Sequence, residues 1–341
     1  QSPEHWRPRH PTRVMSVRIL IVKLSSLGDI FHALPAVHAL KSGLNATVDW
    51  VVQTEYLDCV RHFADVTRAI PFHRHAFFGN LPRFLSELRT ERYDLIVDLQ
   101  GILKSAGVLR LARGMRRIGP SFHREGTRLF YSEVAGPQNK NRHAVDENLD
   151  VVRHLGLPVG EPCFPLNVPD IPLAVPRPRI GMVPSSRWPA KNWPAQSFAV
   201  AGSALQKRAG AHIFLFGGEA DITVTGAIAA AMEKSGATDL AGRTTIVESM
   251  GLLKQMDLVI ANDSGPMHIA AALNVPVVAL FGPTDPIRTG PYGSSHRVVR
   301  AKDTPCSPCF EAHCRKPDHA CMAGIRPDAV IDAALELLRG Q

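Results

Sequence analysis

The chain has 341 residues, 45% of them hydrophobic, which is enough for two domains that each bury a core. Its formal net charge of +8 permits three kinds of partner: nucleic acid, an anionic membrane surface and phosphorylated small molecules. Nucleic acid is the least favoured, because the basic residues are dispersed, no nucleic-acid-binding motif occurs and few aromatic residues are present to stack on bases.

Residues 1–15 form a polar, proline-containing arm that we expect to be disordered. The arm lacks the apolar middle of a signal peptide. No apolar run in the chain approaches the ~20 residues that a membrane-spanning helix needs. We therefore expect a soluble protein.

The first half alternates short apolar runs with helix-like segments. The apolar runs lie at 17–24, 48–52 and 94–99, and they have the length of buried strands. This alternation predicts a parallel sheet with helices on both faces. We assign residues 16–165 to a first α/β domain.

A proline-rich stretch at 156–178 interrupts the pattern and has the composition of a domain boundary. Four further strand-and-loop units follow it: PRIGMVPSS, AHIFLFGG, DLVIANDSG and VPVVALFGP. We assign residues 175–325 to a second α/β domain, with a cleft between the two. Ligands of such sheets bind at the carboxyl ends of the strands, so the polar residues there are the candidates for function.

The loop KLSSLGD, residues 23–29, follows the first expected strand. Gly28 allows a sharp turn or the close approach of a ligand, and free amides of the next helix could bind an anion. Asp29 then has two interpretations. It is an ordinary acid of a first helical turn, which the local pattern alone favours, or it takes part in chemistry. Pro35 indicates either a kinked helix or one that begins near Leu34.

The loop NDSGPMH, residues 262–268, follows a strand in the second half. Pro266 fits the first helical position, with Ser264 or Gly265 as the cap. The exposed amides of such a turn suit a diphosphate, and Asp263 could accept hydrogen bonds from sugar hydroxyls. A simple capped turn is the alternative, but His268 and the rest of the motif are more elaborate than capping requires.

Two other loops of the second half carry polar residues. The hydroxyls of Ser185 and Ser186 and the charge of Lys191 suit a phosphate. The same loop contains two tryptophans, which are expected to serve in packing more than in covering a base. FGGEAD, residues 216–221, ends another strand, and one of its two acids could hold ribose hydroxyls, although GG with an acid is also common in turns.

The cysteines at 306, 309, 314 and 321 have the pattern C-x2-C-x4-C-x6-C. Cys306, Cys309, Cys314 and Cys321 are soft ligands that could hold a structural zinc ion. The second half of the pattern lacks the usual C-x2-C spacing. Reduced thiols or a redox pair are therefore the favoured alternative.

Several enzyme classes lack their motif in this sequence. No serine-hydrolase elbow, Walker loop or HExxH pattern occurs, and the first loop is not GxGxxG, which argues against an ordinary dinucleotide dehydrogenase. The motifs that do occur resemble those of lipopolysaccharide heptosyltransferases of glycosyltransferase family 9. They are VRILIVKLSSLGDIFHALPAVHALK, DLQGILKSAG, SFHREG, HAVDENLDVVRHLG, PSSRWPAKNWP, FGGEAD and NDSGPMHIAAALNVPVVALFGPTDPIRTGPYG.

The resemblance extends from about residue 17 to the C-terminus. The segments DLQGILKSAG and HAVDENLD look most like heptosyltransferase I, whereas the cysteine block is similar to heptosyltransferase II and to unassigned relatives. It implies a GT-B fold, in which two Rossmann-like domains face each other across a cleft. It also implies that the helix expected within 326–341 packs back on the first domain.

The resemblance further implies an inverting transferase that needs no metal and no other cofactor. The donor would be ADP-L-glycero-D-manno-heptose, bound by the second domain, and the acceptor a Kdo-bearing lipid A or a growing inner core. Asp29 matches the general base. The donor-binding candidates are Ser185, Ser186, Lys191, Glu219, Asp221, Asp263, Ser264, Gly265, Pro266 and His268.

The acceptor is anionic, which gives the basic composition a purpose. The enzyme would work at the cytoplasmic face of the inner membrane, held there by charge. The acceptor-binding candidates are Ser26, Gly28, Arg68, Arg74, Gln100, Lys104, Arg124 and His143. Each of the cations among them could instead be an ordinary surface charge.

Two alternatives stay open. The first is a family 9 transferase with another acceptor, such as that of heptosyltransferase II, or with another nucleotide-sugar. The second, more remote, is a non-catalytic, zinc-containing protein that binds nucleic acid.

Overall fold

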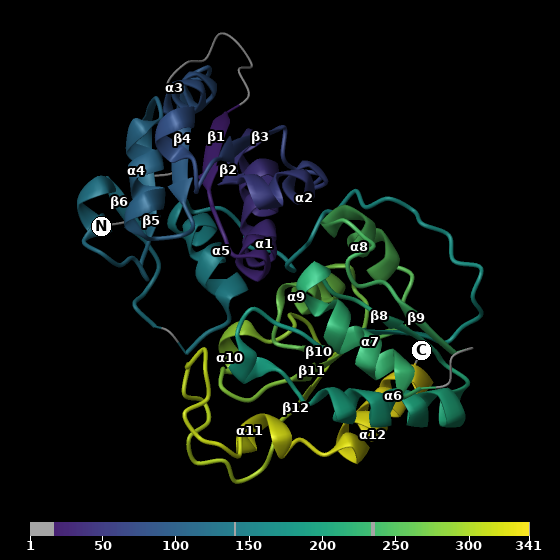
Figure 1. Cartoon of the computed structure of the whole chain (residues 1–341). Helices are drawn as coiled ribbons and strands as arrows, with labels where there is room; N and C mark the ends of the chain where they lie inside the picture. Colours follow the sequence, from purple (N-terminus) through teal and green to yellow (C-terminus); the bar gives the residue numbers. More distant parts are fainter. Residues whose placement is uncertain (1–16, 140, 233–235, 341) are drawn as a thin grey trace. The chain divides into compact units, whose positions relative to one another are not determined.

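The computed structural model describes residues 17–139, 141–232 and 236–340. The chain divides into two compact units, Gln1–Asn167 and Val168–Gln341 (Figure 1), and the division falls inside the proline-rich stretch noted above. The arm expected at 1–15 lies outside the described residues.

The first unit contains a six-stranded sheet in the order β3-β2-β1-β4-β5-β6, with every pair of neighbours parallel. This is the strand order of a Rossmann-type domain. The strands are β1 (Arg18–Val22), β2 (Thr47–Gln53), β3 (Arg68–Phe72), β4 (Tyr93–Asp98), β5 (Gly114–Pro120) and β6 (Glu133–Ala135).

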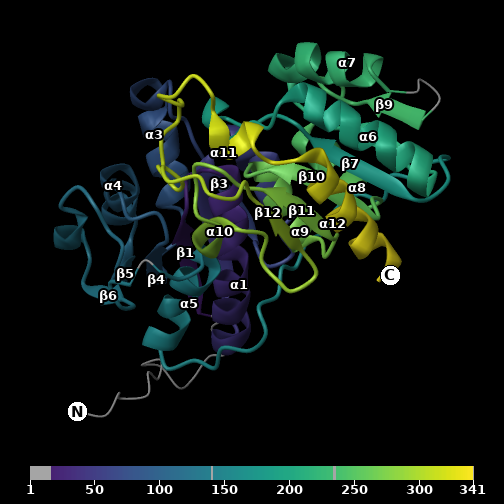
Figure 2. The same ribbon diagram turned by 90° about the horizontal axis from the view of Figure 1, so that it is seen from below.

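Helices cover both faces of this sheet, with α1 and α5 on one side and α3 and α4 on the other (Figure 2). Leu20 and Val22, alternate residues of β1, pack into the core beneath α3 and α4. The helices are α1 (Leu27–Leu44), α2 (Leu57–Arg61), α3 (Phe77–Leu88), α4 (Leu103–Leu111) and α5 (Ala144–His154), with the 3-10 turns η1 (Thr54–Tyr56) and η2 (Thr127–Phe130).

Helix α1 begins at Leu27 and contains Pro35 in its interior. Of the two alternatives for Pro35, a helix that begins near Leu34 is therefore wrong, and the proline lies inside a longer helix. The reason is the reciprocal cap between Ser26 and Asp29, which satisfies amides of the first turn well before the proline. Asp29 is thereby fixed in the first turn, directly beyond the carboxyl end of β1.

The second unit repeats the same architecture, with a parallel sheet in the order β12-β11-β10-β7-β8-β9. Its central strands β10 and β11 are fully buried and apolar except for Asn262, as expected for strands covered on both faces. The strands are β7 (Arg179–Val183), β8 (His212–Leu215), β9 (Ala237–Asp239), β10 (Leu258–Asn262), β11 (Val277–Leu280) and β12 (Arg297–Val299).

The helices of the second unit include one at the C-terminal end, α12, which packs against α6. Its apolar stripe, including Val330, Ile331 and Ala334, belongs to the core of the second unit. The expected packing of this helix on the first domain stays a prediction. The elements are η3 (Pro189–Lys191), α6 (Ala195–Ala209), η4 (Glu219–Asp221), α7 (Ile222–Ala230), α8 (Ile246–Leu253), α9 (Gly265–Ala272), α10 (Pro286–Thr289), α11 (Ala320–Ala323) and α12 (Pro327–Arg339).

The α/β class with two parallel sheets, predicted from the alternation of apolar runs, is confirmed. Within the described residues, no helix combines the length and the apolar character that crossing a bilayer demands. Both sheets place their strand-to-helix loops at the carboxyl edge, and most of the candidate residues lie in these loops.

Candidate active site

Asp29 lies half-buried in the first turn of α1, and its carboxylate is held by the loop before it. The backbone amide and the hydroxyl of Ser26 donate to Asp29 Oδ2 at 3.0 and 2.7 Å. These bonds and the helix N-terminus both favour the ionised form of the side chain. The buried Gly28 lets α1 start tightly at this point. Structural capping and the chemistry expected of Asp29 are therefore compatible.

Gln100 fixes this loop from the neighbouring strand end. Its side-chain oxygen accepts from the amides of Leu24 and Ser25, both at 3.1 Å. Gln100 was expected to bind an acceptor, but its amide oxygen is committed to the loop that carries Asp29. Its contribution is to hold that loop in place.

A buried polar cluster around Asp98 positions Gln100 through the backbone amide of Gln100. Asp98, fully buried, accepts hydrogen bonds from Tyr131 Oη at 2.7 Å, Ser105 Oγ at 2.8 Å and the Gln100 amide at 2.7 Å. Burial raises the pKa of Asp98, and these hydrogen bonds act in the opposite direction. Sequence reasoning did not single out this cluster.

Lys23 is a second residue that the sequence did not reveal. It is 5% exposed at the end of β1, and its Nζ donates to the Leu99 carbonyl at 2.6 Å. Burial lowers the pKa of Lys23, whereas the nearby carboxylates of Asp29, Asp98 and Glu147 raise it. A cation so placed offsets the negative charge gathered around the candidate base.

Three of the basic candidates for the acceptor lie at this same edge. Arg74 precedes α3, Lys104 is the second residue of α4 and Arg124 precedes η2, and all three side chains are exposed. His143 caps α5 by accepting from the Val145 amide at 3.1 Å.

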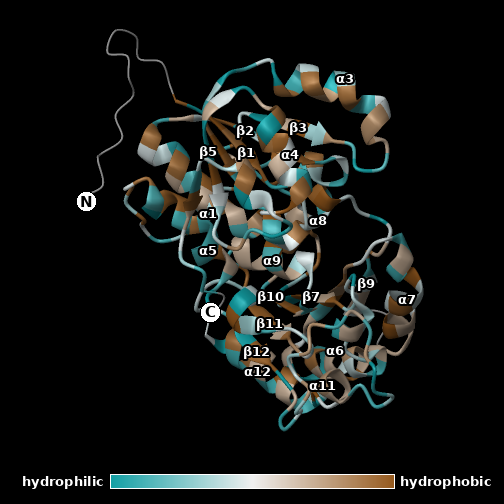
Figure 3. Ribbon diagram, turned by 90° about the vertical axis from the view of Figure 1, so that its left-hand side faces the viewer, coloured by the Kyte–Doolittle hydropathy of each residue, from teal (hydrophilic) through white to brown (hydrophobic). Residues whose placement is uncertain are grey.

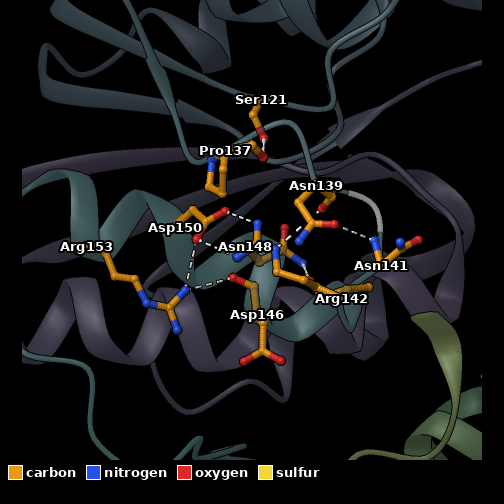
Figure 4. Close-up of polar contacts among 10 residues, drawn as sticks. Ser121, Pro137, Asn139, Asn141, Arg142, Asp146, Asn148, Asp150 and Arg153 are labelled. Carbon is orange, nitrogen blue, oxygen red and sulfur yellow. Dashed lines mark hydrogen bonds and ion pairs between the residues drawn. The ribbon is translucent and has the colours of Figure 1, made fainter. Parts of the chain in front are cut away.

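The segment before α5 is anchored by an ion pair (Figure 4). Both terminal nitrogens of Arg142 reach the buried carboxylate of Asp150, at 3.1 and 2.5 Å. Arg153 binds the same carboxylate from the next turn of α5. The pair fixes the entry to α5 and so the position of His143.

Arg68 does not belong to this group, which corrects its assignment as an acceptor ligand. It is the first residue of β3, at the amino end of the strand. Its guanidinium binds Asp49 Oδ2 at 2.7 Å and Tyr93 Oη at 2.9 Å. Arg68 therefore neutralises a buried carboxylate, which would be costly to leave unpaired.

The second unit brings Lys191 and Asp263 together at its own carboxyl edge. Lys191 Nζ lies 2.7 Å from Asp263 Oδ2 and 4.7 Å from the centre of the Trp188 ring. Thr284, from the loop after β11, donates to the same Asp263 oxygen at 2.7 Å. His268 Nε2 lies 3.9 Å from the other carboxylate oxygen. The two residues expected to contact phosphate and sugar are thus direct neighbours.

Asn262 joins the two loops that carry these residues, a role that no local sequence pattern indicates. Its side chain is fully buried, donates to the Pro184 carbonyl at 2.7 Å and accepts from the Trp193 amide at 3.1 Å. The loop after β7 and the turn after β10 are therefore tied through one amide group. Trp193 itself packs in the core, as its expected structural role requires.

The turn after β10 leads into α9 with the expected cap. Ser264 is the N-cap, and Gly265 and Pro266 open the helix. The Ser264 hydroxyl has no hydrogen-bond partner among the residues that the structure describes. By contrast, the Ser186 hydroxyl is hydrogen-bonded to the Asn192 side-chain oxygen and to the Trp188 carbonyl. Ser264 and the first amides of α9 therefore form a site suited to an anion.

The two acids after β8 have different surroundings. Asp221 accepts from the Gly218 amide at 2.8 Å and so stabilises its own turn. Glu219 is exposed at the same edge of the sheet. This arrangement favours Glu219 over Asp221 as the acid that faces a ligand, an alternative that the sequence left open.

The four clustered cysteines do not fit a metal site as they lie. All are free thiols; Cys321 is buried, whereas Cys309 and Cys314 are exposed. Burial raises the pKa of the Cys321 thiol, and the other three thiols are near enough to add to this. Yet nowhere in 17–139, 141–232 and 236–340 do three His, Cys, Asp or Glu side chains converge as metal ligands. The expectation of structural zinc is not supported.

With this geometry established, the chain can be compared with known proteins. The model of glycosyltransferase family 9 (heptosyltransferase) matches residues 82–319, more than half of the chain. The lipopolysaccharide heptosyltransferase 1 of Pseudomonas aeruginosa is 30% identical over 314 residues, which cover 87% of each chain. The chain belongs to glycosyltransferase family 9.

Further relatives agree with this assignment. The lipopolysaccharide heptosyltransferase 2 of Escherichia coli is 29% identical, over 83% of this chain and 88% of that protein. A solved structure of an E. coli ADP-heptose lipopolysaccharide heptosyltransferase II superposes with a TM-score of 0.79 at 25% identity, covering 95% of this chain and 99% of that one. The predicted family and the GT-B class are confirmed, and the protein is a glycosyltransferase.

Proposed function

We propose that this family 9 member is a lipopolysaccharide heptosyltransferase that moves heptose from ADP-L-glycero-D-manno-heptose to a Kdo or inner-core acceptor. The observation that carries the proposal is the Lys191–Asp263 pair, 2.7 Å apart, beside the N-terminus of α9. A cation and free amides suit a diphosphate, and a carboxylate beside them suits the hydroxyls of the attached sugar. The relatives named above, of both heptosyltransferase types, support the same substrate class.

On the donor side, Lys191, the Ser264 hydroxyl and the first amides of α9 would bind the diphosphate. Asp263, oriented by Thr284, would accept hydrogen bonds from the heptose, and Glu219 from the ribose. As the bond between the anomeric carbon and the phosphate oxygen breaks, negative charge grows on the departing ADP. Lys191 and the helix amides would stabilise that charge.

On the acceptor side, Asp29 would act as the general base. It would take the proton from the acceptor hydroxyl while the hydroxyl oxygen attacks the anomeric carbon of the heptose. Attack from the face opposite the leaving ADP inverts the configuration in a single displacement. General-base assistance of this type contributes about 10²–10⁴-fold to the rate.

The acceptor carries carboxylates and phosphates, so Arg74, Lys104, Arg124 and His143 would attract it to the edge that contains Asp29. A lipid-linked acceptor would also bring the enzyme to the cytoplasmic face of an anionic membrane. Metal independence is expected from the family and needs its own test, namely transfer in the presence of a chelator.

The test is to incubate the protein with ADP-heptose and Kdo-bearing lipid A and to follow the added heptose by mass spectrometry. An inner-core acceptor that already carries one heptose distinguishes the two heptosyltransferase types. Asp29→Asn should abolish transfer while ADP still binds. Turnover of that variant at the wild-type rate would exclude Asp29 as the base, and equal transfer from UDP-sugars would exclude the donor.

A further inference from the structure

Three of the large apolar side chains that the first unit exposes lie in or beside helices that bury other apolar residues. Phe84 and Leu88 of α3 and Leu109 of α4 pack on the sheet. In the same two helices, Phe78 is 86% exposed and Leu103 is 51% exposed, and Leu129 in the neighbouring η2 is 90% exposed. Figure 3 shows hydrophobic turns on α3. Side chains this exposed contribute nothing to the core of the unit.

These side chains lie at one edge of the sheet. The strands of the sheet are parallel, so all their carboxyl ends share one edge. Phe78 lies in the first turn of α3, after β3; Leu103 begins α4, after β4; and Leu129 lies in η2, after β5. This is also the edge at which α1 begins with Asp29.

The same three segments are basic. Residues 73–78, 101–104 and 121–130 carry Arg74, Lys104, Arg124 and Arg128, all exposed, and Glu125 is the single acid in these ranges. The Glu125 carboxylate accepts from the Leu103 amide at 2.8 Å and so caps α4. We call this surface the apolar–basic rim: Phe78, Leu103 and Leu129 together with Arg74, Lys104, Arg124 and Arg128.

We propose that the apolar–basic rim docks the first unit on the surface of an anionic lipid bilayer. Exposed apolar side chains surrounded by cations are complementary to the surface of an anionic bilayer. The phenyl ring and the aliphatic side chains enter the boundary of the acyl chains, and the cations remain at the head groups. This inference rests on the proposed function in so far as that acceptor is lipid-linked. It adds which surface meets the membrane, and it brings Asp29 to the interface at which such an acceptor is embedded.

The composition of the rim favours a bilayer over other anionic partners. Nucleic acid or a free sugar phosphate would use the cations but would leave Leu103 and Leu129 without a matching apolar surface. Met115 provides an internal comparison, because it is 70% exposed but lies at the start of β5, at the opposite edge of the sheet.

The experiment is co-sedimentation of the full chain with vesicles of phosphatidylcholine, with and without phosphatidylglycerol. The wild type should bind the anionic vesicles, and binding should weaken as salt is added. Phe78→Ser with Leu129→Ser should lower that binding about tenfold or more, and Arg128→Glu should also lower it. Met115→Ser is the matched control and should bind as the wild type does.

Activity separates this inference from the proposed function. The Phe78→Ser, Leu129→Ser variant should transfer heptose normally to a deacylated, water-soluble acceptor and poorly to the acceptor in vesicles. If the wild type transfers to no acceptor, the proposed function fails while vesicle binding still tests the rim. Wild-type binding by the double variant, loss of binding in Met115→Ser, or preference for nucleic acid over vesicles would overturn the inference.

Discussion

Lys191 and Asp263 form a close ion pair at the carboxyl edge of the second sheet, with 18% and 5% of their side chains exposed. Each of the two residues was expected to contact the donor. Before a ligand arrives, each is the other's partner, with the Trp188 ring on one side of the ammonium group. An arriving diphosphate would therefore share Lys191 with Asp263, and the pair keeps the lysine extended in the position where it is needed.

We expect Lys191→Met to weaken ADP binding by about 1.5–3 kcal/mol, the usual contribution of a hydrogen bond to a charged group. The variant also leaves Asp263 without its cation, so its free energy of unfolding should fall. Isothermal titration with ADP and urea denaturation measure the two effects. Lys191→Arg retains the charge and should recover most of the stability; unchanged ADP affinity in Lys191→Met would contradict the assigned role.

Glu219 and Asp221 offer a matched comparison only two residues apart. Glu219→Gln should weaken ADP binding without changing stability, because Glu219 is exposed. Asp221→Asn should destabilise the turn after β8 by about 1 kcal/mol, because its bond to the Gly218 amide is weakened. Titration with ADP and thermal unfolding of both variants show which acid contacts the ligand and which stabilises the turn. The opposite pattern would assign the ribose contact to Asp221.

Lys23 should influence the pH dependence of transfer without touching substrate. Replacing it by Met removes a cation near Asp29 and Asp98, so protonation of the base becomes easier. The acidic limb of the rate profile should then move to higher pH. The profile of kcat against pH measures this, and Lys23→Arg should restore the wild-type limb. A lower rate at every pH with no shift of the limb would indicate a purely structural role.

Glu133 should make the first unit sensitive to acid. Its carboxylate binds Arg116 Nε at 2.5 Å and His154 Nε2 at 2.8 Å, and these bonds, the one from Arg116 foremost, lower the pKa of Glu133 to about 2. A carboxyl whose pKa is depressed by folding stabilises the protein above its unfolded pKa, about 4.5, and loses that contribution as the pH falls toward 2.

Because Glu133 is partly exposed, we expect a contribution of about 1–2 kcal/mol at neutral pH, below the value implied by the full pKa shift. Urea denaturation of Glu133→Gln and the wild type should differ by that amount at pH 7. The difference should vanish near pH 2. An equal difference at both pH values would mean that the lost stability does not come from the ionised carboxylate.

The residues that could be predicted from the sequence are those whose signal is local. Asp29 and the turn at Asn262–Pro266 each follow an apolar strand and lie at the start of a helix. The strand, the turn and the helix cap can therefore be predicted from a short stretch of sequence. Gln100, which binds amides 75 and 76 residues away, had no such signal. The role of its side-chain oxygen depends on which strands are neighbours, and that is a property of the folded sheet.

Arg68 was misassigned for the same reason. From the sequence alone, a lysine or arginine near a strand is a candidate to bind an anionic acceptor, because the residue opposite it on the adjacent strand is not known. That neighbour is Asp49, directly opposite Arg68 in the register of β2 and β3. The cysteine spacing leaves zinc open beside the favoured free thiols, and the four cysteines are free thiols that do not converge as metal ligands.

The side-chain amide of Asn262 should restrict local opening of the second unit. The backbone amide of Trp193 lies in a loop, where amide hydrogens ordinarily exchange with solvent quickly. It donates instead to a fully buried side chain that is anchored in β10. Its exchange with deuterium should therefore be as slow as that of the central strands, and it should accelerate together with the turn around Asp263 when Asn262 is replaced by Ala.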